Sequence, residues 1–242
     1  IVVLGGINMD LIATTPRLAN PGETVIGDTF YTAPGGKGGN QAVAASRMGG
    51  RVSMIGRVGT DIFGPILLKE LQGYGVDVEG VATDSEHSSG IAVILLNAER
   101  QNHIVQILGA NMQCDDRQLT VARSFLDGAN VLMLQLEIPH AVSLATAKEA
   151  KKLGVTVMWD PAPASAGFPL KSFEALDVVT PNQTEAEALT GIAVTDIRSA
   201  KSAAEELHRM GASTVVVKLG EDGVYYSGAD GNGHVGSHDV EQ

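Results

Sequence analysis

"VLMLQLEIPHAVSLATAKEAKKLGVTVMWD", residues 131–160, is the stretch that decides the fold class. Two apolar runs, VLMLQL from Val131 and VTVMWD from Val155, flank a segment of helical character from about Pro139 to Leu153. Apolar strands joined through a helix are typical of a parallel sheet whose two faces are covered by helices. We therefore predict an α/β fold with a central, mostly parallel sheet.

The rest of the chain extends this pattern in both directions. Further apolar runs begin at Asp177 and Thr214, and helices are expected at about 183–190 and 197–210. Toward the N-terminus we expect strands at 1–5 and 51–59 and helices at about 40–48 and 61–74. Two β-rich pieces, roughly 9–35 and 88–108, interrupt the alternation. We predict that these two pieces pair as a small separate sheet, and that residues 1–8, 36–87 and 109–242 form the α/β core.

Composition narrows the classes of partner. The chain has 242 residues and a net charge of -11, which disfavours binding to nucleic acid or to acidic lipid. One cysteine, Cys114, allows no internal disulfide and fits a reducing compartment. No apolar run reaches membrane-spanning length. We therefore expect a cytoplasmic protein that acts on small molecules.

Polar residues and glycines follow the ends of the predicted strands, where ligands bind in open α/β sheets. Loops are generally polar, so each residue alone says little. Together they form a candidate site, and its members at these positions are Asn8, Asp10, Gln135, Glu137, Asp160, Thr180, Asn182, Lys218, Gly220 and Gly223.

A glycine-rich segment, "APGGKGGNQAVAASRMG" at 33–49, resembles a phosphate loop at first sight. A phosphate loop needs Ser or Thr after its lysine, but Lys37 is followed by Gly38. The dinucleotide fingerprint also fails, because GGINMD lacks the third glycine. We interpret the glycines as clearance for a ligand, with Lys37 and Asn40 as polar contacts. A flexible tether is the alternative.

Three further side chains suit a ligand rich in hydroxyl groups. The Asp10 carboxylate accepts protons from neighbouring hydroxyls, and the Asn8 amide both donates and accepts. Either residue alternatively caps a turn. Glu137 follows an apolar run and is either a ligand contact or a partly solvated loop acid.

The segment "TPNQTEAEALTG", residues 180–191, also has two interpretations. Asn182 and Glu185 have the Asn-x-x-Glu spacing of a capping box, which is a purely structural device. Placed at the positive end of a helix, the same side chains could organise phosphate and hydrated magnesium.

Taken together, LGGINMDLI, GGKGGNQAVAA, LQLEIP, DPAPA, TPNQTEAEALTG and KLGEDGV resemble, in order, the ribokinase family of sugar kinases. The resemblance implies ATP-dependent phosphorylation of the terminal hydroxyl of D-ribose. It implies that the small sheet is a lid over the sugar and pairs two subunits in a homodimer. There are two alternatives. One is a related kinase whose substrate is another sugar or a nucleoside, and the other is a sugar-binding protein that lacks catalysis.

The resemblance also assigns roles. It implies sugar contacts from Asn8, Asp10, Gly36, Lys37, Asn40 and Glu137, nucleotide contacts from Asn182, Lys218, Gly220 and Gly223, and magnesium held through water by Glu185. Relatives often carry threonine where this chain has Lys218. Besides Mg²⁺, the family can use a monovalent cation such as K⁺. The family's Gly-Ala-Gly-Asp motif, which carries the catalytic base, is absent here, so we expect it beyond Gln242.

Overall fold

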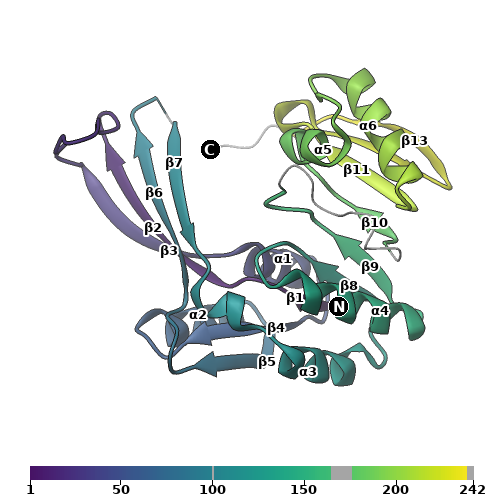
Figure 1. Cartoon of the computed structure of the whole chain (residues 1–242), viewed down its shortest axis with the longest axis horizontal. Coiled ribbons are helices and arrows are strands. Elements are labelled where there is room, and N and C mark those ends of the chain that lie inside the picture. Colours follow the sequence, from purple (N-terminus) through teal and green to yellow (C-terminus); the bar gives the residue numbers. More distant parts are fainter. Residues whose placement is uncertain (100, 165–175, 239–242) are drawn as a thin grey trace. The chain divides into compact units, whose positions relative to one another are not determined.

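The computed structural model of the chain describes residues 1–99, 101–164 and 176–238 (Figure 1). The chain divides into two compact units. The first unit comprises Ile1–Leu4, Leu119–Leu136 and His140–Gln242, and the second comprises Gly5–Gln118 and Glu137–Pro139.

The first unit is built on a mostly parallel sheet with the strand order β13-β12-β11-β10-β9-β8-β1. Its parallel strands are β1 (Val2–Leu4), β8 (Val131–Leu134), β9 (Thr156–Trp159), β10 (Val178–Val179) and β11 (Thr214–Lys218). An antiparallel hairpin, β12 (Val224–Gly228) and β13 (Gly231–Val235), completes the edge. The side chains of Leu132, Leu134, Val157 and Trp159 are fully buried, which explains why these strands are apolar throughout.

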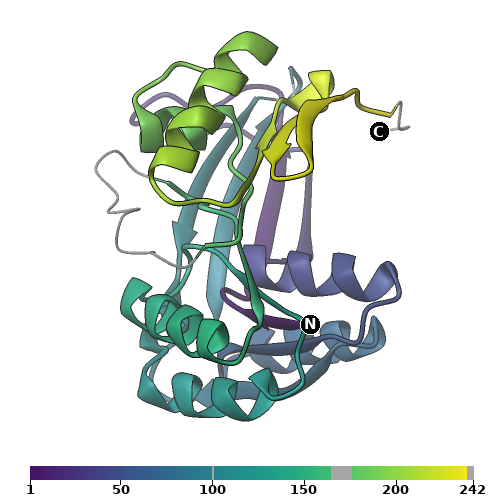
Figure 2. The ribbon, with the colours of Figure 1, turned by 90° about the vertical axis from the view of Figure 1, so that its right-hand side faces the viewer.

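Helices cover this sheet. They are α4 (His140–Lys152), α5 (Gln183–Thr190) and α6 (Ile197–Arg209), while α3 (Asp116–Leu126) begins in the second unit and ends in the first. Helix α4 packs on β8 and β9. Helix α6 packs on β11 and β12, and α5 packs against α6 (Figure 2). In α6 the buried residues Ala200, Ala203, Ala204 and Leu207 recur at helical spacing and face the sheet.

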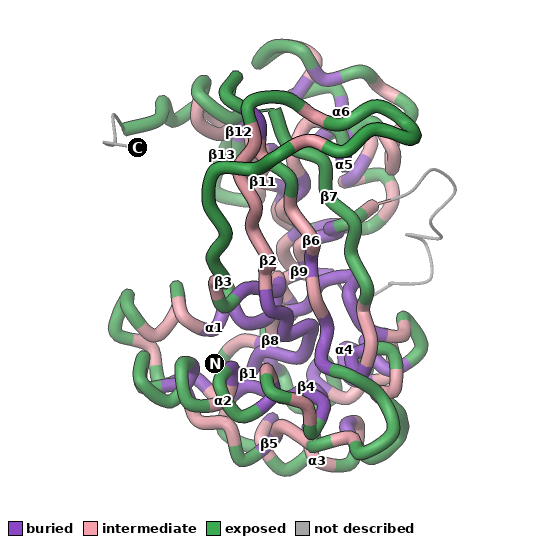
Figure 3. Tube along the Cα trace, turned by 90° about the vertical axis from the view of Figure 1, so that its left-hand side faces the viewer, coloured by how far each residue is buried: buried purple, intermediate pink, exposed green. Residues whose placement is uncertain are grey.

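The second unit contains a parallel strand pair and a separate small sheet. The pair is β4 (Ser53–Gly59) and β5 (Asp77–Asp84), against which helices α1 (Lys37–Arg47) and α2 (Phe63–Gly73) pack. The small sheet has the order β3-β2-β6-β7, from β2 (Asn8–Thr15), β3 (Thr29–Gly35), β6 (Gly90–Asn97) and β7 (Asn102–Ile107). Strand β7 is exposed along its whole length (Figure 3).

The predicted fold class is confirmed, because a mostly parallel sheet flanked by helices is accompanied by a small separate sheet. Three local features differ from the sequence-based expectation. Strand β5 and helix α3 were not anticipated, since the sequence DVEGVATD of β5 mixes charges with glycine and lacks a clear strand pattern. Helix α1 begins at Lys37 and not near Asn40, because tertiary packing overrides the low helix propensity of Gly38 and Gly39. Within the described ranges, none of the helices is long and apolar enough to cross a membrane.

Candidate functional site

Six of the predicted site residues lie together in the second unit, and we call them the glycine-loop cluster. They are Asn8, Asp10, Gly36, Lys37, Asn40 and Glu137. Asn8 and Asp10 project from β2, and Asn8 pairs with Gly35 at the end of β3. Lys37 opens helix α1, with Gly36 at its N-cap. Strand pairing and the helix start therefore bring together residues that lie up to 129 positions apart.

The Gly36 backbone makes this arrangement possible. Gly36 has φ 86°, a conformation that favours glycine. A Cβ atom on Gly36 would lie 2.6 Å from the backbone nitrogen of Asn8 and 2.8 Å from the carbonyl oxygen of Gly6. The absence of a side chain at Gly36 therefore lets the protein's own backbone approach closely, and the contact of Gly36 with a sugar stays a prediction.

Glu137 is the most tightly held member of the cluster. Its side chain is buried, and the backbone N–H of Lys37 donates to Glu137 Oε2 at 2.7 Å. The side-chain amide of Gln106 donates to Glu137 Oε1 at 2.6 Å. Burial raises the pKa of Glu137, while these two donors and the charge of Lys37 oppose that rise and the charge of Asp10 adds to it. Glu137 is thus a buried, oriented carboxylate and not a solvated loop acid.

Asp10 supplies a second carboxylate. Its side chain is half-buried, and burial raises its pKa although the nearby Lys37 ammonium acts in the opposite direction. Two carboxylates beside one lysine provide several acceptors and a set of ammonium donors within a small volume. This composition suits a neutral ligand with several hydroxyl groups.

Asn8 is held by a residue that the sequence analysis missed. Asn111 is fully buried, and its side-chain amide donates to Asn8 Oδ1 at 2.8 Å. The Asn111 side-chain oxygen accepts a hydrogen bond from the backbone N–H of Ile7 at 2.9 Å. A Cβ atom on Gly90 would lie 2.1 Å from Asn8 Oδ1, so only glycine fits there. A Gly-Ala-Asn run just after a predicted strand was the one sequence signal for Asn111.

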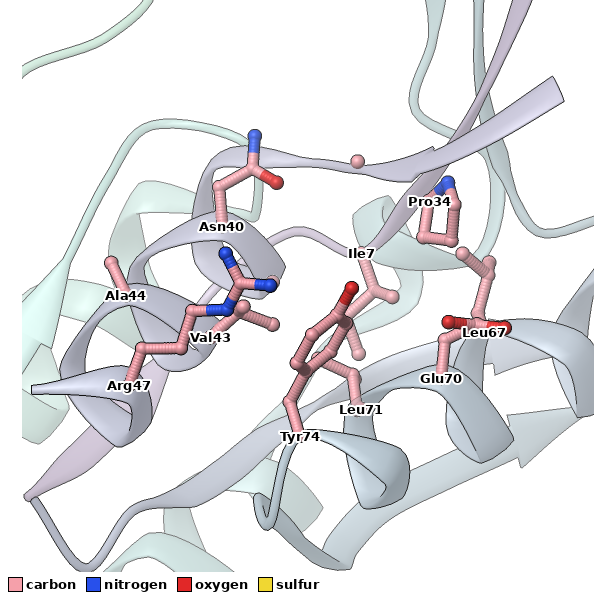
Figure 4. Close-up of a pocket in the computed structure, with 12 residues that line it drawn as sticks. Ile7, Pro34, Asn40, Val43, Ala44, Arg47, Leu67, Glu70, Leu71 and Tyr74 are labelled. Atoms are coloured by element: carbon pink, nitrogen blue, oxygen red, sulfur yellow. The ribbon is translucent and has the colours of Figure 1, made fainter. Parts of the chain in front are cut away.

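Asn40 lies at the rim of a cavity of about 330 Å³ between α1 and α2 (Figure 4). The cavity floor is apolar and includes Ile7 and Leu71. Arg47 and Tyr74 also line the cavity, and the Arg47 guanidinium lies over the Tyr74 ring, 4.8 Å from the ring centroid. Because Asn40 is exposed, its amide is accessible to a ligand near the start of α1.

The remaining predicted residues lie in the first unit, and we call Asn182, Glu185 and Lys218, with Asp160, the capping-box cluster. The Asn182 side chain accepts from the backbone N–H of Glu185, and Glu185 Oε2 accepts from the backbone N–H of Asn182, each at 2.8 Å. The predicted capping box is thus present. Lys218 Nζ forms an ion pair with Asp160 Oδ1 at 2.9 Å and lies 4.0 Å from Glu185 Oε2.

Gly220 and Gly223 shape the turn that follows Lys218. Both have positive φ, at 62° and 85°. A Cβ atom on Gly223 would lie 2.1 Å from the carbonyl oxygen of Val235, whereas one on Gly220 would meet no heavy atom within 4 Å. The space at Gly220 is open, and a ligand can approach the backbone there.

The residues that could hold magnesium are few. In residues 1–99, 101–164 and 176–238, no three His, Cys, Asp or Glu side chains gather in a way that could hold a metal ion. Mg²⁺ commonly keeps several waters and binds through one or two carboxylates together with substrate phosphates. The Glu185 carboxylate fits that role, because only its Oε2 atom is engaged by the capping box.

Comparison with known proteins agrees with this architecture. Residues 1–241 match the family described as pfkB family carbohydrate kinase. The chain belongs to this family, and the resemblance derived from its motifs is confirmed.

Two relatives and one structure illustrate the match. The ribokinase of Haemophilus influenzae is 37% identical over 227 residues, which cover 94% of this chain and 74% of that protein. The deoxyribokinase of Salmonella typhi is 34% identical over 235 residues, covering 97% of this chain and 77% of that protein. The structure of Arabidopsis thaliana ribokinase complexed with ribose and ATP has a TM-score of 0.88 at 30% identity, covering 100% of this chain and 78% of that one.

Proposed function

We propose that this protein transfers the terminal phosphoryl group of ATP to the terminal hydroxyl of D-ribose. The observation that carries the proposal is the glycine-loop cluster, in which the Asp10 and Glu137 carboxylates and Lys37 surround the start of α1. The ribokinase of Haemophilus influenzae and the ribose-bound structure from Arabidopsis thaliana support the choice of sugar.

In this proposal the glycine-loop cluster fixes the sugar. Asp10 and Glu137 accept hydrogen bonds from hydroxyl groups, while the side chains of Asn8, Lys37 and Asn40 donate or accept around them. Phosphoryl transfer depends mainly on positioning and on stabilisation of charge. Orienting the sugar through several hydroxyls is therefore the main contribution of this cluster.

The capping-box cluster holds the nucleotide in the same proposal. The N-terminus of α5 offers a positive end to phosphate oxygens, and Glu185 holds hydrated Mg²⁺, which neutralises charge on those oxygens. Lys218 and the turn glycines Gly220 and Gly223 contact the nucleotide. A monovalent cation such as K⁺ is a further proposed activator.

The experiment that tests the reaction is ADP release by the full-length protein with ATP, Mg²⁺ and a panel of sugars. The Salmonella typhi deoxyribokinase makes 2-deoxy-D-ribose the second candidate substrate. Release with D-ribose well above that with 2-deoxy-D-ribose, hexoses and nucleosides supports the proposal. Higher ADP release with one of the other compounds would identify that compound, and not D-ribose, as the substrate. Sugar binding without ADP release would indicate a binding protein.

Two matched capping boxes separate a structural role of Asn182 from a functional one. Helix α6 begins with a second box, Asp196 and Ser199. Replacing either cap, Asn182→Ala or Asp196→Ala, is expected to cost about 1 kcal/mol of unfolding free energy. We expect only Asn182→Ala to weaken ATP binding in the presence of Mg²⁺, as measured by calorimetry. Equal ATP affinity in the two variants would show that the box at α5 is structural alone.

Ribose affinity is expected to fall as the solution is acidified. The fall should begin at a higher pH than it would if Asp10 and Glu137 had the usual pKa values of carboxyl groups. Burial raises the pKa of both Asp10 and Glu137, whose usual values are 3.8 and 4.5. A carboxylate accepts hydrogen bonds from hydroxyl groups, and protonation weakens that capacity, so binding is present near neutral pH and is lost as pH falls through the raised pKa values. Calorimetric titrations with ribose over a pH series check this. Undiminished affinity down to the usual value of 4.5, in folded protein, would contradict it.

The small sheet is proposed as the lid and as the surface that pairs two copies in a homodimer. Its strands expose apolar side chains, including Phe30, Tyr31, Ile104 and Val105, and unpaired outer edges of a sheet favour pairing with another chain. The molecular mass of the protein in solution tests the homodimer, which would have twice the mass of one chain. The cytoplasm is the proposed compartment, on the basis of the single cysteine, Cys114.

A further inference from the structure

Gln106 is a polar residue on the exposed strand β7 with one specific partner. Its side-chain Nε2 donates to Glu137 Oε1 at 2.6 Å. Hydrogen bonds to an ionised acceptor are shorter and stronger than those between neutral groups. An exposed glutamine on an edge strand has many other conformations available, so this bond selects one of them at a cost in side-chain entropy.

The register of the small sheet places Gln106 in line with Asp10. Asp10 on β2 pairs with Ala92 on β6, and Ala92 pairs with Gln106 on β7. Residues directly opposite one another across a sheet project from the same face. Asp10 and Gln106 therefore share a face, and the small side chain of Ala92 separates them.

Glu137 links this face to the start of α1. One carboxylate oxygen accepts from Gln106, and the other accepts from the backbone N–H of Lys37. A carboxylate has about four lone-pair positions. Two of these positions are used by the protein donors, which fix the direction of the carboxylate, and the other two are not used by these bonds.

We infer that Gln106 is a positioning residue of the sugar site, whose amide orients the Glu137 carboxylate and connects strand β7 to the glycine loop. This inference rests on the proposed function. It adds a residue that none of the sequence motifs indicates, and it makes the small sheet a contributor to the site through Glu137.

The electrostatic surroundings of Glu137 define a measurement that needs no sugar. The charged groups that act on Glu137 are Lys37 on α1 and Asp10 on β2. Gln106 is one of the donors that favour its ionised form. Removing that donor from a buried carboxylate must raise the pKa of Glu137 further.

The first test is a carbon-13 NMR titration of the Glu137 carboxyl group in sugar-free protein. Gln106→Met keeps the length of the side chain and removes its amide. We expect a higher pKa of Glu137 in Gln106→Met than in the wild type. The control is Val105→Met, on the opposite face of the same strand, which is expected to leave that pKa unchanged. An unchanged pKa in Gln106→Met would overturn the inference, whatever the protein phosphorylates.

The second test is steady-state kinetics of the full-length protein with ribose and ATP. We expect Gln106→Met to raise KM for ribose about tenfold or more and to change kcat little, because a Glu137 carboxylate that is no longer oriented loses its hydrogen bond to the sugar. Gln106→Glu, which places a second carboxylate beside Glu137, is expected to raise KM more than Gln106→Met near neutral pH. Wild-type KM in both variants would overturn the inference, while an inactive wild type would count against the proposed function instead.

Discussion

Replacing Asp10 with alanine is expected to abolish measurable ribose binding while leaving ATP affinity nearly unchanged. Asp10 is a half-buried carboxylate beside Lys37, and we propose that it accepts hydrogen bonds from two neighbouring hydroxyls of the sugar. Hydrogen bonds to a charged group contribute about 1.5–3 kcal/mol each, so losing two of them lowers affinity at least about a hundredfold. The residues proposed to bind ATP belong to the other compact unit. Calorimetric titration of the variant with each ligand measures both effects.

Asp28→Ala is the matched control for this prediction. Asp28 belongs to the same unit and is exposed, just before β3. Its replacement removes the same charge without touching the glycine-loop cluster, so both affinities should stay at the wild-type level. Unchanged ribose binding in Asp10→Ala would remove Asp10 from the sugar site. A parallel loss of ATP binding would point to general disruption of the fold.

Replacing Gly36 with alanine is expected to destabilise the fold strongly and to weaken ribose binding at the same time. At φ 86° and ψ 138°, a backbone conformation that residues other than glycine rarely adopt, an alanine costs about 1–3 kcal/mol. The added Cβ would also lie 2.6 Å from the Asn8 backbone nitrogen, and relieving such crowding costs about 1–3 kcal/mol more. Because Asn8 and Lys37 flank this contact, ribose affinity should fall together with stability. Urea denaturation measures the first effect and calorimetry the second.

Gly49, just beyond the other end of α1, is a comparison position with positive φ but without crowding. It has φ 88°, almost the same as Gly36, but a Cβ atom there would meet no heavy atom within 4 Å. Gly49→Ala should therefore cost only the conformational part, about 1–2 kcal/mol, and leave ribose binding unchanged. An equal loss of unfolding free energy in Gly36→Ala and Gly49→Ala would contradict the prediction, because it would mean that a Cβ atom at Gly36 causes no crowding.

Features set by neighbours in the sequence were predictable. The alternation of apolar strands with helices indicated the α/β class, and the range 183–190 for α5 agrees with the structure. The capping box was readable because Asn182 and Glu185 are three residues apart and their hydrogen bonds close within one helical turn. The two β-rich segments were recognised because they interrupt that alternation, and the structure confirms that they pair. Only the structure shows that β2 and β6 run parallel.

The sequence by itself determined the fold class, the family and the polar residues at the strand ends. The side chains that orient these polar residues through hydrogen bonds became known only from the tertiary structure. Asn111 lies 103 residues from Asn8, and Gln106 lies 31 residues from Glu137, so no local spacing links either pair. Tertiary packing also decided that α1 starts at Lys37, within a glycine run that local propensity leaves non-helical. The physical reason is that propensity and capping act within a few residues, whereas the orientation of a buried polar side chain depends on donors that the folded chain supplies from distant segments.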